Sequence, residues 1–129
     1  MTEVRILVAD DSEVEREQLL RTFFQVLGDS VVVKTCATRM AVEQIQLLRP
    51  DVLVLDLPAP HRDGIQVLRE IRRESPSAVI IMFTADPSVV LQEVCLEAGA
   101  NYYLHKTQLR ELIEICSDRL VRAETAPNW

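Results

Sequence analysis

A chain of 129 residues, of which 48% are hydrophobic and 26% charged, suits one globular domain and is too short for two. The net charge of −6, with Lys and Arg dispersed, argues against direct nucleic-acid binding, which needs a concentrated positive face. No apolar run approaches the roughly 18 residues of a membrane span, and the first residues carry an acid where a signal peptide would be basic. We therefore expect a soluble cytoplasmic protein.

Short apolar runs alternate with longer stretches of helical periodicity along the chain. In chain order the predicted elements are a strand at Val4–Val8, a helix from Ser12 to Gly28, a strand at Val31–Val33, a helix from Thr38 to Pro50, a strand at Val52–Leu55, a helix from Asp63 to the residue before Pro76, a strand at Val79–Phe83, a helix from Asp86 to Gly99, a strand at Tyr102–Leu104 and a helix from Thr107 through Leu120. Strands that are apolar throughout suit a parallel sheet covered on both faces. The pattern predicts an α/β fold, an open doubly wound sheet of five parallel strands between five helices.

Several helix boundaries carry sequence signals. Ser12-Glu13-Val14-Glu15 has the form of a capping box, in which the Ser and Glu side chains bind backbone N–H groups at the helix start. Asp86-Pro87 places a capping residue before a proline at the first helical position. Thr38 and Thr107 are expected to cap the second and fifth helices. The side chains expected on the buried side of the fourth helix are those of Val90, Val94 and Ala98.

Cysteine usage excludes two further classes of protein. Cys36, Cys95 and Cys116 are odd in number and widely spaced, and no CxxC pair or Cys/His cluster occurs. Neither a disulfide framework nor a zinc site is therefore indicated. We expect the three thiols to be small core residues.

Polar side chains gather where the predicted strands end. In sheets of this kind, ligands bind outside the carboxyl ends of the strands, near the point where the strand order reverses. The residues at the five ends are Asp10 and Asp11, Thr35, Asp56, Thr84, and His105 with Lys106. Three carboxylates, a hydroxyl and an ammonium group are therefore expected at one edge of the sheet.

This set of groups points to phosphoryl transfer. Asp10, Asp11 and Asp56 would repel one another strongly without a cation. Mg²⁺ relieves the repulsion, because it prefers oxygen ligands from one or two carboxylates, waters and phosphate. Lys106 adds a positive charge suited to phosphate, and Thr84 adds a hydroxyl donor. A free carboxylate in such surroundings can attack phosphorus and form an acyl phosphate.

The same motifs, in order, resemble the receiver domain of two-component response regulators over roughly residues 4–121. Asp10-Asp11 closes the first strand, and Asp56 ends the third, with a proline four places and a glycine eight places after it. Thr84-Ala85 ends the fourth strand and Lys106 the fifth. The resemblance implies a flavodoxin-like fold and a phosphorylation-driven switch of bacterial signal transduction.

The resemblance also implies the acceptor and the metal ligands. Asp56 would take a phosphoryl group from a sensor histidine kinase or a phosphotransfer protein. Mg²⁺ would be held by Asp10, Asp11, Asp56 and the backbone carbonyl of Pro58.

The remaining matching residues would bind phosphate or act as a switch. Thr84 and Lys106 would bind the phosphoryl oxygens, helped by the backbone N–H groups of Leu57 and Ala85. Tyr103, an aromatic residue that in isolation would be read as a packing residue, would turn inward as Thr84 moves toward the phosphate. This would remodel the face made by the fourth helix, fifth strand and fifth helix, through which a homodimer could also form.

Thr107 and Pro58 depart from the pattern of the family, and Asp86 stands at another position implicated in phosphate lifetime. Thr107 stands where a proline in a cis peptide bond usually follows the lysine; a cis bond before threonine costs about 3–4 kcal/mol, so we expect a trans bond and a different start to the fifth helix. Pro58 cannot orient a hydrolytic water, and Asp86 would repel incoming hydroxide. We therefore hypothesise slow self-dephosphorylation.

Two other functional classes stay open. A pseudo-receiver would be a protein-interaction module that never takes phosphate, although the intact set of site residues argues against it. A phosphatase with an aspartyl nucleophile would need a general acid two places after it, where Pro58 stands. We expect a domain that phosphorylates and dephosphorylates only its own aspartate. The receiver domain is expected at residues 1–122, and 123–129 would be a tail or the start of a linker to an effector domain.

Overall fold

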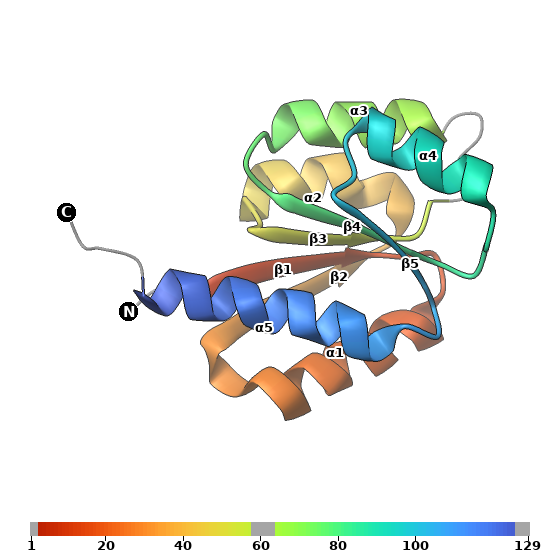
Figure 1. The fold of residues 1–129 in the computed structure, drawn as a ribbon. Coiled ribbons are helices and arrows are strands. Elements are labelled where there is room, and N and C mark those ends of the chain that lie inside the picture. The colour runs from red at the N-terminus through yellow and green to blue at the C-terminus, as the bar shows by residue number, and fades with distance from the viewer. Residues whose placement is uncertain (1–2, 58–63, 126–129) are drawn as a thin grey trace.

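The protein folds as a three-layer α/β sandwich (Figure 1), in a computed structural model that describes residues 3–57 and 64–125, with side chains described through Ala123. The elements are β1 (Val4–Ala9), α1 (Glu13–Leu27), β2 (Val31–Cys36), α2 (Ala41–Leu48), β3 (Val52–Leu55), α3 (Ile65–Glu74), β4 (Val79–Thr84), α4 (Val89–Ala98), β5 (Tyr102–His105) and α5 (Leu109–Thr125). Two short 3₁₀ turns, Gly28–Ser30 and Thr38–Met40, precede β2 and α2.

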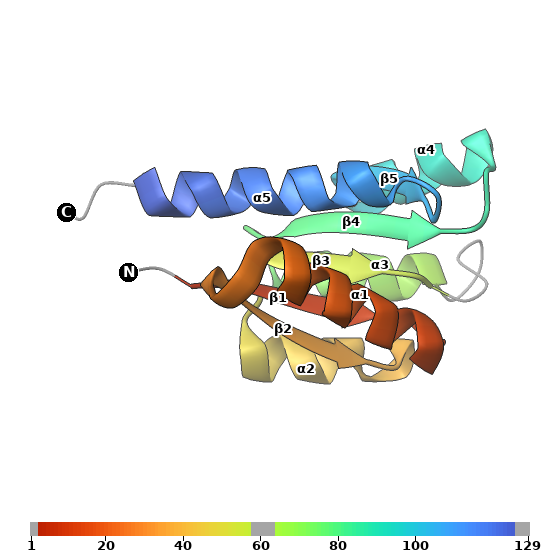
Figure 2. The same ribbon diagram turned by 90° about the horizontal axis from the view of Figure 1, so that it is seen from below.

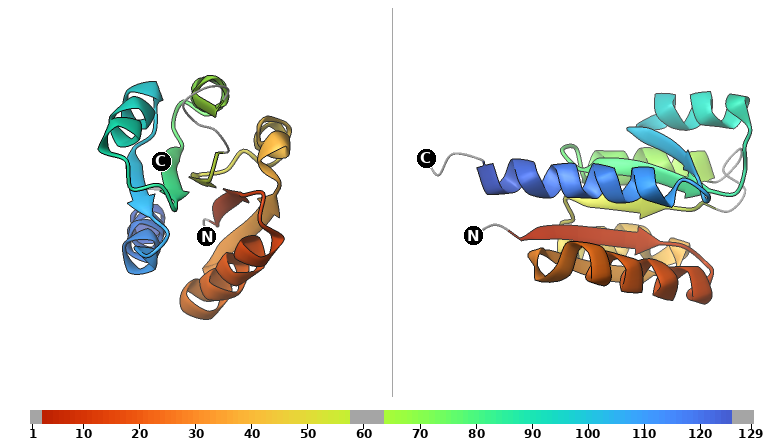
Figure 3. Two further views of the ribbon diagram at one scale, coloured as in Figure 1. Left: turned by 90° about the vertical axis from the view of Figure 1, so that its right-hand side faces the viewer. Right: turned by 60° about the horizontal axis from the view of Figure 1, so that its bottom comes forward.

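The five strands form one parallel sheet in the order β2-β1-β3-β4-β5. Helices α2, α3 and α4 cover one face of the sheet (Figures 1 and 3), and Figure 2 looks onto the other face, which α1 and α5 cover. The chain runs outward from β1 to β2 and then returns to β3 on the other side, so the strand order reverses between β1 and β3. The predicted fold is confirmed, and the edge where such sheets bind ligands lies at the carboxyl ends of these two strands.

Burial on both faces explains why the central strands β1, β3 and β4 are largely apolar. In β1, Leu7 and Ala9 belong to the core under α2, α3 and α4, whereas Ile6 and Val8 belong to the core under α1 and α5. Successive side chains of a strand point to opposite faces, so a strand without a solvent face shows no polar alternation. No helix within residues 3–57 and 64–125 is long and apolar enough to cross a bilayer.

The thiols largely follow the sequence interpretation. Cys95 on α4 and Cys116 on α5 are completely buried, one in each core. Cys36 at the end of β2 is only half-buried, and all three are free. Burial raises the pKa of the Cys116 thiol to about 12, which makes it unreactive.

Helix α4 begins later than predicted. Ser88 caps it, because its hydroxyl accepts the N–H of Leu91 at 3.1 Å. The Asp86 carboxylate instead accepts the N–H of Ser88 at 2.9 Å, in the turn before the helix. The buried side is therefore made by Leu91, Cys95 and Ala98, and the prediction for Val90 is wrong, since its side chain is 71% exposed.

The two predicted threonine caps are also wrong. Thr38 lies in a 3₁₀ turn, and its hydroxyl donates to the backbone carbonyl of Asp56 at 3.0 Å. Thr107 precedes α5 by two residues, and its hydroxyl lies 2.8 Å from Nδ1 of His105. The starts of the 3₁₀ turn and of α2 have no side-chain cap, and the hydrogen bond of the Thr107 hydroxyl goes to His105 rather than to an N–H of α5.

Arg72 of α3 ties together the elements on its side of the sheet. Its guanidinium donates to the backbone carbonyls of Ser75, Pro76, Ala78 and Gly99 and to Oδ1 of Asn101, at 2.7–3.3 Å. Only the planar guanidinium fork can reach acceptors in so many directions at once.

Replacing Arg72 should therefore destabilise the fold. Arg72→Met is expected to lower the free energy of unfolding by about 2–3 kcal/mol, because several half-buried carbonyls lose their donor. Urea unfolding followed by circular dichroism measures this effect. The matched control is Arg73→Met, because Arg73 is an exposed neighbour on the same helix. Equal unfolding midpoints for the two variants would contradict the assigned role.

Candidate functional site

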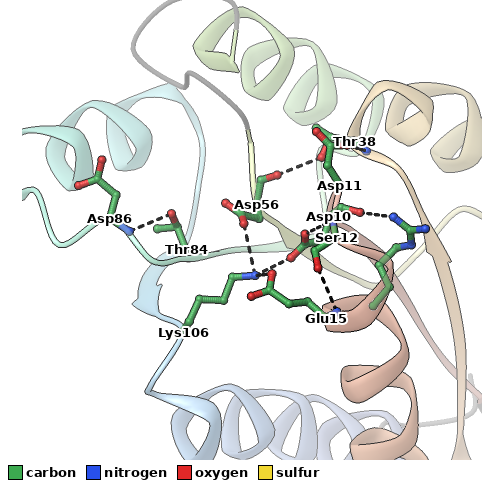
Figure 4. A network of polar contacts seen from close by, with 10 residues as sticks. Asp10, Asp11, Ser12, Glu15, Thr38, Asp56, Thr84, Asp86 and Lys106 are labelled. Carbon is green, nitrogen blue, oxygen red and sulfur yellow. Dashed lines mark hydrogen bonds and ion pairs between the residues drawn. The ribbon is translucent and has the colours of Figure 1, made fainter.

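Three side chains that follow β1, β3 and β5 meet at the predicted edge of the sheet (Figure 4). Asp10 follows β1, Asp56 follows β3 and Lys106 follows β5. Backbone bonds fix the strand ends, since Asp56 N–H donates to Ala9 at 2.9 Å and Lys106 N–H donates to Thr84 at 2.8 Å. Because the strands are parallel and in register, residues far apart in the sequence reach one point.

The ammonium group of Lys106 lies at the centre of the site. Its Nζ atom is 2.5 Å from Oδ2 of Asp10 and 3.3 Å from Oδ2 of Asp56, and it also donates to the carboxylate of Glu15. The ring centroid of Phe83 lies 5.5 Å from Nζ. With its side chain only 15% exposed, Lys106 compensates the charge of three acids in a partly desolvated place.

The pKa values of the site reflect this crowding. Burial raises the pKa of Asp56; the charge of Lys106 opposes the rise, and the charges of Asp10 and Glu15 add to it. Burial acts to lower the pKa of Lys106, but its hydrogen bonds to Asp10 and Glu15 outweigh burial and leave that pKa above its ordinary value. Lys106 therefore keeps its positive charge.

The acids of the site form a donor set that fits a hard divalent cation. Asp10, Glu15 and Asp56 each offer a carboxylate oxygen, and these oxygens lie within 4.8 Å of one another. Oxygen-rich sites with one or two carboxylates and water suit Mg²⁺. The ammonium group of Lys106 contacts all three acids, so a cation bound there would have to share them with Lys106 or displace it.

Glu15 is the site residue that the sequence did not reveal. Half of the predicted capping box forms, because the hydroxyl of Ser12 accepts the N–H of Glu15 at 3.3 Å. The other half does not, because Ser12 N–H donates to Oδ1 of Asp10 at 2.8 Å and the Glu15 carboxylate extends to Lys106. The predicted capping box had given the Glu15 side chain a local role. Only the tertiary fold shows that its partner is Lys106.

Asp11, the second acid of the motif, is not part of the trio. Its Oδ1 atom accepts the N–H of Thr38 at 2.9 Å, and the residue is exposed (Figure 4). Its role as a metal ligand stays a prediction. Pro58, whose carbonyl was the fourth expected ligand, lies outside the described residues.

The predicted switch residues meet in the loop between β4 and α4. The Thr84 hydroxyl accepts the N–H of Asp86 at 3.2 Å, and the Tyr103 hydroxyl donates to the carbonyl of Asp86 at 2.8 Å. Burial, followed by the charge of Asp86, raises the pKa of Tyr103 to about 12. Of the two expected backbone donors, Leu57 is buried and Ala85 is exposed. Thr84 and Tyr103 thus share one contact residue.

The His105 side chain connects two segments next to the site. Its Nε2 atom lies 3.0 Å from the Ala85 carbonyl, and Nδ1 accepts the N–H of Thr107 at 3.2 Å. The ring thus joins the loop after Thr84 to the turn that carries Lys106. The described residues contain no cis peptide bond, so the predicted trans bond before Thr107 is confirmed.

Comparisons with known proteins agree with this geometry. A family model described as "Response regulator receiver domain" matches residues 6–117. Response regulator MprA of Mycobacterium bovis is 40% identical over 111 residues, which are 85% of this chain and 47% of that protein. A protein-glutamate methylesterase/protein-glutamine glutaminase of Alkalilimnicola ehrlichii is 36% identical over 104 residues, 80% of this chain and 27% of its own length.

The similarity extends to solved structures. The crystal structure of a two-component response regulator, LuxR family, from Aurantimonas sp. SI85-9A1 has a TM-score of 0.77 at 29% identity, and the match covers 93% of this chain and 86% of that one. The chain thus spans half or less of these two curated relatives but most of this solved structure. The match to this solved structure shows that the two share the α/β fold over nearly the whole of this chain.

Proposed function

The chain belongs to the family of response regulator receiver domains, and from this premise we propose that Asp56 accepts a phosphoryl group in a Mg²⁺-dependent reaction. One observation carries the proposal: the Asp56 carboxylate lies 3.3 Å from the Lys106 ammonium, within a trio of acids whose oxygens are close enough to share one cation. The phosphodonor would be a sensor histidine kinase or a phosphotransfer protein of the cytoplasm.

Asp56 acts as the nucleophile in this proposal. One of its carboxylate oxygens attacks phosphorus, an acyl phosphate bond forms, and the bond between phosphorus and the donor breaks. Asp10 and Asp56 are the described acids that would hold Mg²⁺, which when bound neutralises charge on the phosphoryl oxygens. Asp11 and the carbonyl of Pro58 are the further ligands that we propose.

The groups around Asp56 would stabilise the phosphoryl group. The Lys106 ammonium and the Thr84 hydroxyl would donate to its oxygens, together with the backbone N–H groups of Leu57 and Ala85. Pro58, two places after the nucleophile, offers no general acid for an external substrate. The domain would thus act only on its own aspartate, in phosphorylation and in slow dephosphorylation.

The signal would leave the site through Thr84 and Tyr103. Both contact Asp86, so a shift of Thr84 toward phosphate would disturb the loop that Tyr103 holds. The affected face is made by α4, β5 and α5, and we propose it for an effector, a target protein or a second copy. A domain at residues 1–122, followed by a tail or linker at 123–129, is part of the proposal.

Incubation with a small acyl phosphate tests the proposal against the pseudo-receiver alternative. With Mg²⁺, intact-protein mass spectrometry should show the addition of one phosphoryl group, and the adduct should be lost in neutral hydroxylamine, which cleaves acyl phosphates. With EDTA in place of Mg²⁺, the adduct should be reduced to background. A chain that stays unmodified at saturating donor and Mg²⁺ would favour the pseudo-receiver.

A further inference from the structure

We propose that Glu15 restrains Lys106. The Lys106 ammonium group must break its contact with the Glu15 carboxylate before it can bind the oxygens of the phosphoryl group. The inference rests on the proposed function, because it concerns the same lysine. It assigns a role to a residue of α1, whereas the family motifs lie at the strand ends.

The contacts of Lys106 show that its capacity as a donor is already used. An ammonium group has three N–H donors and no acceptor. Asp10 and Glu15 are the two nearest carboxylates, and Asp56, the proposed acceptor, is the farthest of the three at 3.3 Å. The Lys106 ammonium group therefore lies closer to Asp10 and Glu15 than to Asp56, the proposed nucleophile.

Glu15 has no competing partner in the described part of the chain. Lys106 is the one hydrogen-bond and ion-pair partner of its side chain among the described residues, whereas the Asp10 side chain also accepts the N–H of Ser12. Glu15 is 41% exposed, so solvent can take over when the contact breaks. Such a contact is strong enough to bias the position of a side chain and weak enough to be released.

The surroundings leave room for that release. Glu15, Phe83 and Lys106 line a cavity of about 130 Å³ that opens between α1 and the start of α5. Movement of Glu15 into this space would free one donor of Lys106 for a phosphoryl oxygen. It would also take a negative charge away from the incoming phosphate.

The restraint predicts effects of opposite sign on two measurements. At saturating Mg²⁺, Glu15→Gln should speed phosphorylation by a small acyl phosphate about two- to fivefold, the value of one part-exposed charge-assisted contact. The same variant should bind Mg²⁺ more weakly, because the site loses one negative charge. A variant that is merely damaged would lose on both measurements.

The matched control is Glu17→Gln, because Glu17 is an exposed acid of the same helix and the substitution makes the same change in net charge. A double-mutant cycle shows whether Glu15 acts through Lys106. In a Lys106→Met background, Glu15→Gln should leave the phosphorylation rate within twofold of that background. Glu15→Ala gives a second variant without the carboxylate.

The outcomes separate the two proposals. If the wild type is phosphorylated and both Glu15 variants react at its rate or more slowly, the restraint is refuted and the proposed function stands. Equal acceleration with and without Lys106 also refutes it, since charge repulsion alone would then explain the rate. If the wild type takes no phosphoryl group, the proposed function itself has failed and the restraint falls with it.

Discussion

Asp56→Asn is expected to abolish phosphoryl incorporation and to leave the fold intact. The neutral amide that replaces the carboxylate has no oxygen able to form the acyl phosphate. The new side chain keeps the size of aspartate, and the backbone bond from residue 56 to Ala9 is unaffected. Intact-protein mass spectrometry after treatment with a small acyl phosphate and Mg²⁺ gives the result directly.

The control for this variant is Asp29→Asn. Asp29 is an exposed acid in the turn before β2, at the opposite edge of the sheet from the site. The Asp29→Asn variant should take up phosphoryl groups at the rate of the wild type. Incorporation into Asp56→Asn above background would mean that another residue is the acceptor.

Lys106→Met should have the second largest effect, on both chemistry and stability. Without the ammonium group, phosphorylation should slow by about 100-fold or more, the cost of one lost electrostatic stabiliser in a phosphoryl-transfer site. In the absence of Mg²⁺ the variant should also lose about 2 kcal/mol of folding free energy, because three acids within 4.8 Å of one another lose their common partner.

Magnesium should rescue the stability of this variant. A cation that binds the folded state stabilises it by mass action, and it replaces the charge that Lys106 supplied. Urea unfolding with and without Mg²⁺ should therefore show a larger stabilisation for Lys106→Met than for the wild type. Lys34→Met, which changes an exposed lysine on β2, is the matched control. Equal responses to Mg²⁺ in the three proteins would exclude Lys106 as the counter-ion of the acidic trio.

The sequence predicted the strands and the residues at their ends for a physical reason. A strand buried on both faces must be apolar throughout, and the first polar residues after such a run mark the edge of the sheet. Asp10 and Asp56 are of this kind, and the structure brings them together with Lys106, which follows the less buried edge strand β5. The fold and the centre of the site were therefore predictable.

Helix starts and long-range side-chain contacts were not predictable in the same way. Thr38 has the residue type of a cap, but its hydroxyl binds the carbonyl of Asp56, 18 residues away. Glu15 reaches Lys106, 91 residues away, after a capping box had supplied a local role. A polar side chain can form its hydrogen bonds with nearby backbone groups or with residues distant in the sequence. Only the packing of α1 and α2 on the sheet decides which of these it does.

Direct identification of the modified residue tests the central claim, that the acidic edge of the sheet exists to phosphorylate Asp56. The protein is treated with a small acyl phosphate and Mg²⁺, and borohydride then reduces any aspartyl phosphate to homoserine, which peptide sequencing by mass spectrometry locates. We predict a single homoserine at position 56, absent from the sample with EDTA. Homoserine at another position, or none in a fully folded sample, would contradict the account.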